Sequence, residues 1–110
     1  MAQYEELYIE QGSTFQYVIT LSNPAGGAFD LTSYTARSQL KRSYKSVSAT
    51  DFTITYPNRA AGQIQLNLTD ENTALLKHGN YVFDVIIESS SGEIYRVIEG
   101  IAFIDPGVTE

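Results

Sequence analysis

The stretch Leu76–Val85, which reads LKHGNYVFDV, decides the fold of this chain. A Leu-x-x-Gly-x-Tyr turn leads straight into alternating apolar residues, as in many β-sandwich proteins where the chain enters a central strand. We expect Tyr81 to bury its ring and to turn its hydroxyl back onto the backbone of the preceding corner. Gly79 would supply a backbone angle that a Cβ disfavours. The sequence therefore predicts a structural corner at Leu76, Gly79 and Tyr81.

Apolar residues alternate with polar ones on both sides of this stretch, and the pattern predicts about seven strands. By number, these strands fall at 13–22, 34–42, 51–56, 63–67, 81–88 and 93–105, with an edge strand or detached arm at 1–11. Turn signals recur roughly every 8–12 residues, and the long helical crossovers that parallel strands require are missing. The prediction is one all-β antiparallel sandwich over residues 1–110, with 106–110 as a tail.

Two local features qualify this pattern. Residues 69–77 have the pattern of a short helix, with Thr69 as a candidate N-cap. A helix this short is expected only as a crossover between the two sheets. In the last strand Glu99 falls in phase with Val97 and Ile101. We therefore expect a bulge or bend at Glu99–Gly100.

Composition narrows the classes of function. The 110 residues include 43% hydrophobic residues and no cysteine, so one core is expected and neither disulfides nor thiolate sites can form. A net charge of −6 disfavours nucleic acid and anionic membranes as partners. No apolar run is long enough to span a bilayer, and the N-terminus lacks the pattern of a signal peptide. These features favour assembly in a reducing cytoplasm.

Candidate catalytic and metal-binding residues are few. His78 lies beside a turn glycine and is best interpreted as a solvated turn residue. The adjacent acids Asp70 and Glu71 suit the start of a helix, and the pair Asp84 and Glu88 falls on an outer strand face. The sequence thus predicts no catalytic residue, no metal and no cofactor, and we expect a protein that is not an enzyme.

Surface contacts are the remaining kind of site. The segment Leu7-Tyr8-Ile9 could add a strand to the sheet of a neighbouring protein. Val82 and Ile86 fall on the outer face of their strand, and aromatic residues such as Tyr44 and Tyr95 fall outside the inward pattern. The interface candidates are Leu7, Tyr8, Ile9, Tyr44, Val82, Ile86 and Tyr95. An alternative prediction is a carbohydrate-binding or adhesin-type module, with Tyr44 and Tyr95 near loop carboxylates.

A family resemblance rests on five short segments. They are YEELYIEQG at 4–12, DLTSYTAR at 30–37, LNLT at 66–69, GNYVFDV at 79–85 and RVIEG at 96–100. Together they resemble small virion structural proteins of tailed bacteriophages, especially marine cyanophages. They are also similar to the N-terminal immunoglobulin-like module of phage baseplate upper proteins.

The resemblance implies an immunoglobulin-like sandwich that works as a non-enzymatic building block of a tail, baseplate or fibre attachment. It also implies symmetric copies, a homo-oligomer in contact with other virion proteins, assembled in the host cytoplasm. No catalytic residues come with it, and its motifs mainly build the fold.

Overall fold

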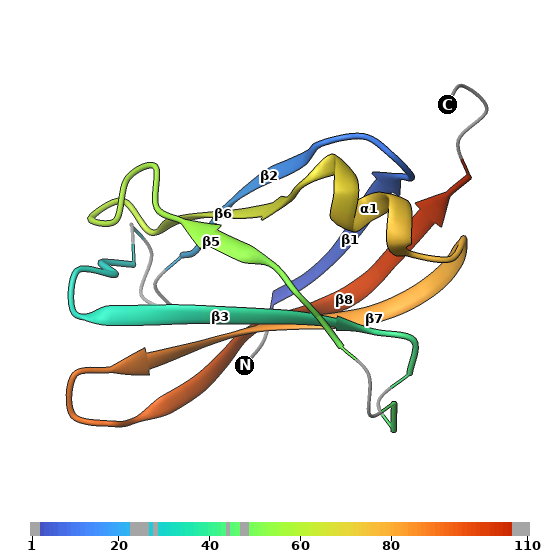
Figure 1. Ribbon diagram of the computed structural model, residues 1–110. Coiled ribbons are helices and arrows are strands. Elements are labelled where there is room, and N and C mark those ends of the chain that lie inside the picture. The colour runs from blue at the N-terminus through green and yellow to red at the C-terminus, as the bar shows by residue number, and fades with distance from the viewer. Residues whose placement is uncertain (1–2, 23–26, 28, 44, 47–48, 107–110) are drawn as a thin grey trace.

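The computed structural model describes residues 3–22, 27, 29–43, 45–46 and 49–106, which form two β-sheets packed face to face (Figure 1). The larger sheet has the order β1 (Gln3–Glu10), β8 (Ile94–Asp105), β7 (Gly79–Ser89), β3 (Tyr34–Lys41), β4 (Thr50–Asp51). The smaller sheet has the order β2 (Phe15–Thr20), β6 (Gln63–Leu68), β5 (Thr53–Thr55). One short helix, α1 (Asp70–Leu75), connects β6 to β7. The predicted all-β sandwich with a helical crossover is confirmed.

The corner that precedes β7 has the geometry that the sequence predicts. The Tyr81 ring is 9% exposed, and its hydroxyl donates to the Lys77 carbonyl oxygen at 2.9 Å. Gly79 has a φ of 129°, which L side chains rarely adopt, and Leu76 is buried beside the corner. The hydroxyl therefore fixes the path by which the chain enters β7.

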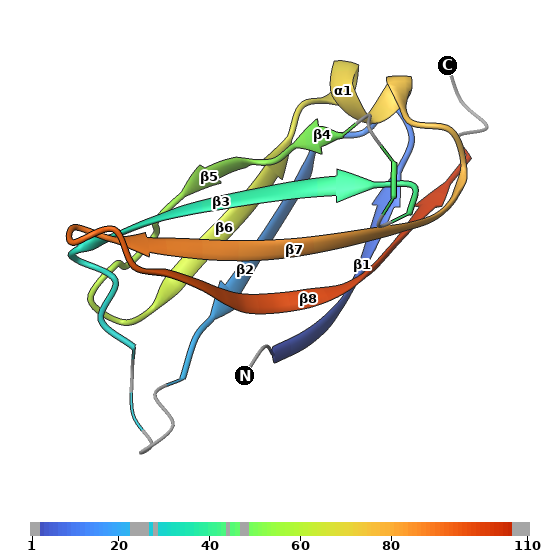
Figure 2. The same cartoon turned by 90° about the horizontal axis from the view of Figure 1, so that it is seen from below.

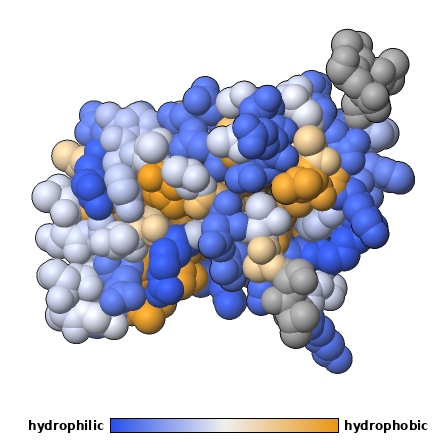
Figure 3. All heavy atoms as spheres, viewed as in Figure 1, coloured by the Kyte–Doolittle hydropathy of each residue, from blue (hydrophilic) through white to orange (hydrophobic). Residues whose placement is uncertain are grey.

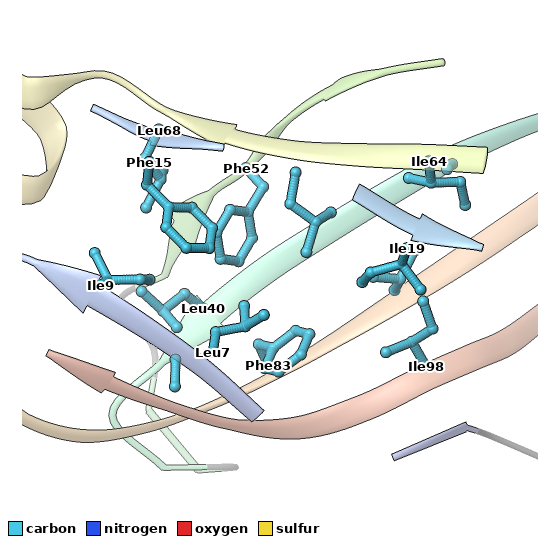
Figure 4. Close-up of a cluster of buried hydrophobic side chains, with 14 of the residues drawn as sticks. Leu7, Ile9, Phe15, Ile19, Leu40, Phe52, Ile64, Leu68, Phe83 and Ile98 are labelled. Carbon is cyan, nitrogen blue, oxygen red and sulfur yellow. The ribbon is translucent and has the colours of Figure 1, made fainter. Parts of the chain in front are cut away.

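The core lies between the two sheets. Figure 4 shows side chains of both sheets pointing toward one another, among them Leu7, Phe15, Leu40, Phe83 and Ile98. Phe52 links the layers, because its ring centroid lies 6.1 Å from that of Phe15 and 6.2 Å from that of Phe83. Burial of such side chains from water is the main term that stabilises a sandwich of this size.

The pairing of β1 corrects the expectation of a purely antiparallel sandwich. β1 runs parallel to β8, with Gln3 opposite Ile98 and Glu10 opposite Asp105. A parallel pair needs a long connection, and here the whole domain supplies it, because the two strands lie at opposite ends of the chain. Figure 2 shows β3, β7 and β8 in order across the larger sheet, and β1 follows β8 at its edge. The remaining pairs are antiparallel.

The phase of β8 corrects a second expectation. Its irregularity lies opposite Val85 and Ile86, since Val85 pairs with Ile98 and Ile86 with Arg96, and the expected bulge at Glu99–Gly100 is wrong. Beyond this point the even-numbered residues of β8 face the core, so Glu99 points outward in regular alternation. Gly100 has another use. A Cβ there would overlap the Glu5 carbonyl oxygen, so glycine lets β1 approach β8.

Three elements differ from their predicted extents. The strand expected at 51–56 divides, because Thr50–Asp51 pairs with β3 and Thr53–Thr55 pairs with β6 in the other sheet. The helix starts at its predicted cap, where Thr69 Oγ1 accepts from the Asn72 N–H at 3.2 Å, but it ends at Leu75. β2 is shorter than the strand expected at 13–22, and its Tyr17 is 36% exposed, because β2 is an edge strand with one open side.

Candidate interaction surface

The segment expected to form an arm is instead an edge strand whose apolar residues lie in the core. Leu7 and Ile9 are fully buried, because alternation along β1 points both of them between the sheets. The side chains of Leu7 and Ile9 are therefore not part of an exposed interface, whereas addition of a strand through the open edge of β1 stays a prediction. Tyr8, which lies between them, points outward and is 64% exposed.

Four side chains of the outer face form an apolar stripe, which we call the Tyr8 stripe: Tyr8, Phe103, Ile101 and Val82. Tyr8 pairs with Phe103 across β1 and β8, and their rings stack with centroids 5.2 Å apart. Ile101 precedes Phe103 by two residues, lies on the same face of β8 and pairs with Val82 of β7. Alternation and register therefore join three strands into one apolar surface.

The other predicted surface residues do not join this stripe. Ile86 is half-buried on the same face but lies beyond the ion pair between Asp84 Oδ2 and Arg96 Nε, whose atoms are 3.2 Å apart. Tyr95 lies in the β7–β8 hairpin arm, and Tyr44 lies outside the described residues. Of the predicted residues, Tyr8 and Val82 are the two that the fold brings into one surface.

A carboxylate lies at the rim of the Tyr8 stripe. The hydroxyls of Tyr4 and Tyr8 both donate to Glu6, at 3.0 and 3.2 Å. The bond to Glu6 raises the pKa of Tyr8 above its ordinary value, because ionising the phenol would place two negative charges together. An apolar centre with a polar rim is the usual anatomy of a protein interface.

Tyr95 lines a separate hollow of about 550 Å³ at the hairpin end of the sandwich. Its ring is 46% exposed, and its hydroxyl donates to Glu93 Oε2 at 3.0 Å. This bond raises the pKa of Tyr95. Phe29, Tyr34 and Ile94 also line the hollow, so it offers aromatic and aliphatic surface beside one carboxylate.

Sequence reasoning missed Ile101 and Phe103. From Ile101 to Ile104 all four residues are apolar, so alternation does not separate the inner from the outer face. A clue was present in Tyr8. Once β1 is placed beside β8, the exposed ring of Tyr8 lies over an odd-numbered residue of β8.

The two acidic pairs considered for catalysis have structural roles, one beside arginines and the other at the start of a helix. Asp84 and Glu88 each lie next to an arginine on the solvated face, with Glu88 Oε1 at 3.3 Å from Arg37 Nη2. Asp70 and Glu71 occupy the first turn of α1, and His78 is exposed. Within the described ranges no three His, Asp or Glu residues cluster as metal ligands do. None of the helices described in the structure has the length and apolarity needed to cross a bilayer.

Comparison with known proteins supports the fold but identifies no family or function. No family model matches the chain, and no curated protein matches it. Among solved structures, the filamin domain of Lin-41 is similar with a TM-score of 0.51 and 13% identity, over 91% of this chain and 84% of that one.

Two other similar structures have lower scores. An internalin-like protein of Listeria monocytogenes has a TM-score of 0.47 and 17% identity, over 94% of this chain and 28% of that one. A chain from a complex of ICOS with ICOS-L and an anti-ICOS-L VNAR domain has a TM-score of 0.47 and 14% identity, over 96% and 56%. The two packed sheets and the similarity to the Lin-41 filamin domain show that the chain has an immunoglobulin-like, filamin-like β-sandwich fold.

Proposed function

We propose that this protein is a non-enzymatic structural module of a tailed-phage virion that docks to other virion proteins and to copies of itself. The observation that carries the docking role is the Tyr8 stripe, an apolar surface bordered on the same sheet face by the charged groups of Glu6, Asp84 and Arg96. The assignment to a tail, baseplate or fibre attachment is supported by the segments at 4–12, 30–37 and 79–85.

Docking would use the outer face of the larger sheet. Tyr8 and Phe103 present stacked rings at low cost in conformational entropy, and aromatic residues of this kind often dominate binding energy. The carboxylate of Glu6 and the Asp84–Arg96 pair flank the stripe and would set the orientation of the partner. This division into an apolar centre and a charged rim gives both affinity and register.

Incorporation into particles tests this function. We expect mass spectrometry of purified virions to find the wild-type protein, and Tyr8→Ala to reduce its incorporation because the stacked ring is lost. Val18→Ala is the matched control, because Val18 is 47% exposed on the other sheet and should leave incorporation unchanged. Absence of the wild-type protein from virions, together with a strict monomer in light scattering, would contradict the proposal.

A carbohydrate-binding module is the second candidate, and the surroundings of Tyr95 favour it. A half-exposed ring beside the Glu93 carboxylate, at the mouth of a hollow, can stack on a sugar and accept its hydroxyl donors. A glycan array is the measurement. Binding that Tyr95→Ala abolishes would support this candidate, and an array without any bound glycan would eliminate it.

A further inference from the structure

The edge of β3 that faces away from β7 is only partly covered. β4 pairs with β3 at Gln39 and Leu40, and no strand of the described part of the chain covers Tyr34–Ser38 on this side. A hollow of about 700 Å³ lies there, with Phe52 and Ile54 on its apolar side. Figure 3 shows exposed apolar atoms in the region between β3 and β5, which Figure 1 shows in the same view.

Three backbone groups of this edge already have partners. Arg59 Nη2 donates to the Tyr34 carbonyl oxygen at 2.9 Å, and the Ala36 N–H donates to the Tyr56 hydroxyl at 2.8 Å. The Ser38 carbonyl oxygen accepts from the Phe52 N–H at 3.0 Å. These contacts show which way the backbone groups of Ala36 and Ser38 point.

The Ala36 C=O and the Ser38 N–H point to the same side, because both backbone groups of one strand residue face one edge. In a parallel pair, one residue of the neighbour donates to the carbonyl before a given residue and accepts from the N–H after it. Ala36 and Ser38 flank Arg37 in this way. An antiparallel neighbour would need both groups of Ala36 or both of Ser38, and one group of each is already bonded.

Charges differ between the two ends of this edge. Arg59 lies at the Tyr34 end, where its guanidinium is bonded to carbonyl oxygens and stacks 3.7 Å over the Tyr56 ring. Asp51 lies at the other end, opposite Gln39. A strand parallel to β3 begins at the basic end and finishes at the acidic end.

We propose that this edge of β3 binds an extended segment of another protein, parallel to β3, whose sequence places an acidic residue before apolar residues and a basic residue after them. The inference rests on the proposed docking function and names a second contact of the same module. The first contact is a sheet face that takes a folded partner, and this edge takes an unfolded segment. The binding mode is strand addition, in which backbone bonds supply affinity and the charges supply direction.

A second copy of this chain fits the edge less well. The sheet-edge strands that the structure describes carry no basic residue, so they offer nothing to Asp51; these strands are β1, β2, β4 and β5. A peptide of mixed charge matches both ends.

The probes are two synthetic peptides of the same composition, Ser-Glu-Val-Thr-Val-Lys-Ser and its reverse, Ser-Lys-Val-Thr-Val-Glu-Ser. We expect the first to bind on the order of tenfold more tightly, measured by NMR titration, with the Ser38 amide among the signals that shift most. Because the reverse peptide would match the charges in antiparallel orientation, tighter binding of that peptide overturns the proposal.

A charge exchange provides the matched test. Asp51→Lys should weaken the first peptide and favour a version in which glutamate replaces its lysine, whereas Glu99→Lys on the far strands should change neither affinity. Absence of any peptide-induced shift at residues 36–38 overturns the proposal. A shift there that depends on protein concentration without peptide also overturns it, because it would indicate that a second copy binds the edge. Incorporation into virions through Tyr8 is a separate measurement, so failure of the peptide test leaves the docking function standing.

Discussion

At the scale of single residues, Tyr81 shows how one side chain fixes a corner. Its hydroxyl holds the Lys77 carbonyl, and the Arg42 guanidinium lies 4.9 Å over its ring. A Cβ at position 79 would lie 2.6 Å from Arg42 Nη1, but the end of that side chain can shift, so the φ of 129° is what requires glycine there. The sequence predicts Tyr81 and Gly79, but Arg42 is distant along the chain and no local pattern predicts its contact.

Removing the Tyr81 hydroxyl tests the corner. Tyr81→Phe keeps the ring and leaves the Lys77 carbonyl without its donor, so we expect the free energy of unfolding to fall by about 1 kcal/mol. Urea denaturation followed by circular dichroism measures it. Tyr8→Phe, whose hydroxyl is bonded on the surface, is the control and should leave stability unchanged. Equal stability of Tyr81→Phe and wild type would show that the hydroxyl does not hold the corner.

Gly100 permits the approach of two strands. In Gly100→Ala the added methyl overlaps the Glu5 carbonyl, so β1 must move and stability should fall by about 1–3 kcal/mol. Amide hydrogen exchange should show the loss of protection in β1 before that in β7. Gly92→Ala is the control, because its added Cβ meets no atom within 4 Å and the cost is backbone strain alone. Unchanged protection of β1 in Gly100→Ala would be evidence against this close approach.

At the scale of elements, prediction succeeded where the two faces of a strand differ in polarity. β6 alternates glutamine and asparagine with isoleucine and leucine, so its inner face is unambiguous. β8 is apolar on both faces after Gly100, and alternation could not give its phase. The stretch at 51–56 alternates throughout, but alternation does not reveal that the chain passes from one sheet to the other at Phe52. For the same reasons Val82 was predicted to face outward and Phe103 was not.

Two edge strands of different sheets are linked on the open side of the sandwich. The Tyr17 hydroxyl of β2 donates to Glu5 Oε1 of β1 at 3.1 Å. This bond raises the pKa of Tyr17 above its ordinary value of 10.0, with smaller contributions from burial and from the charge of Glu5. The folded state therefore favours the protonated phenol.

This link predicts a pH dependence of stability. Because the pKa is higher in the folded state, the contribution of the bond is fully present below about pH 10 and is lost as the pH rises through the folded pKa. The difference in thermal midpoint between wild type and Tyr17→Phe should therefore shrink above about pH 10. A difference that stays constant across this range would mean that the bond does not contribute in solution.

At the scale of the whole molecule, the pairing of the first and last strands forms one edge of the larger sheet. Local pattern identifies both strands but not their pairing, because partners at opposite ends of the chain are set by packing rather than by neighbouring residues. The immunoglobulin-like sandwich was therefore predictable, whereas its parallel edge was not.

Removing β1 tests the contribution of this pairing. A chain without residues 1–10 loses two fully buried side chains, Leu7 and Ile9, and opens the apolar flank of β8, so we expect it to lose cooperative unfolding. A synthetic peptide of residues 1–12, added in excess, should restore the near-ultraviolet circular dichroism of the native core. Control peptides in which aspartate replaces Leu7 should not restore it. Cooperative unfolding of the shortened chain by itself would mean that β1 is dispensable.

The parallel pairing of β1 with β8 also has a mechanical consequence. The chain enters this pair at Gln3, beside Ile98, and leaves it at Asp105, beside Glu10. Tension applied between the two ends therefore pulls these strands in opposite directions along their length, and it loads all of their hydrogen bonds together instead of opening them one at a time. A domain linked at both ends would therefore resist stretching through this single pair of strands.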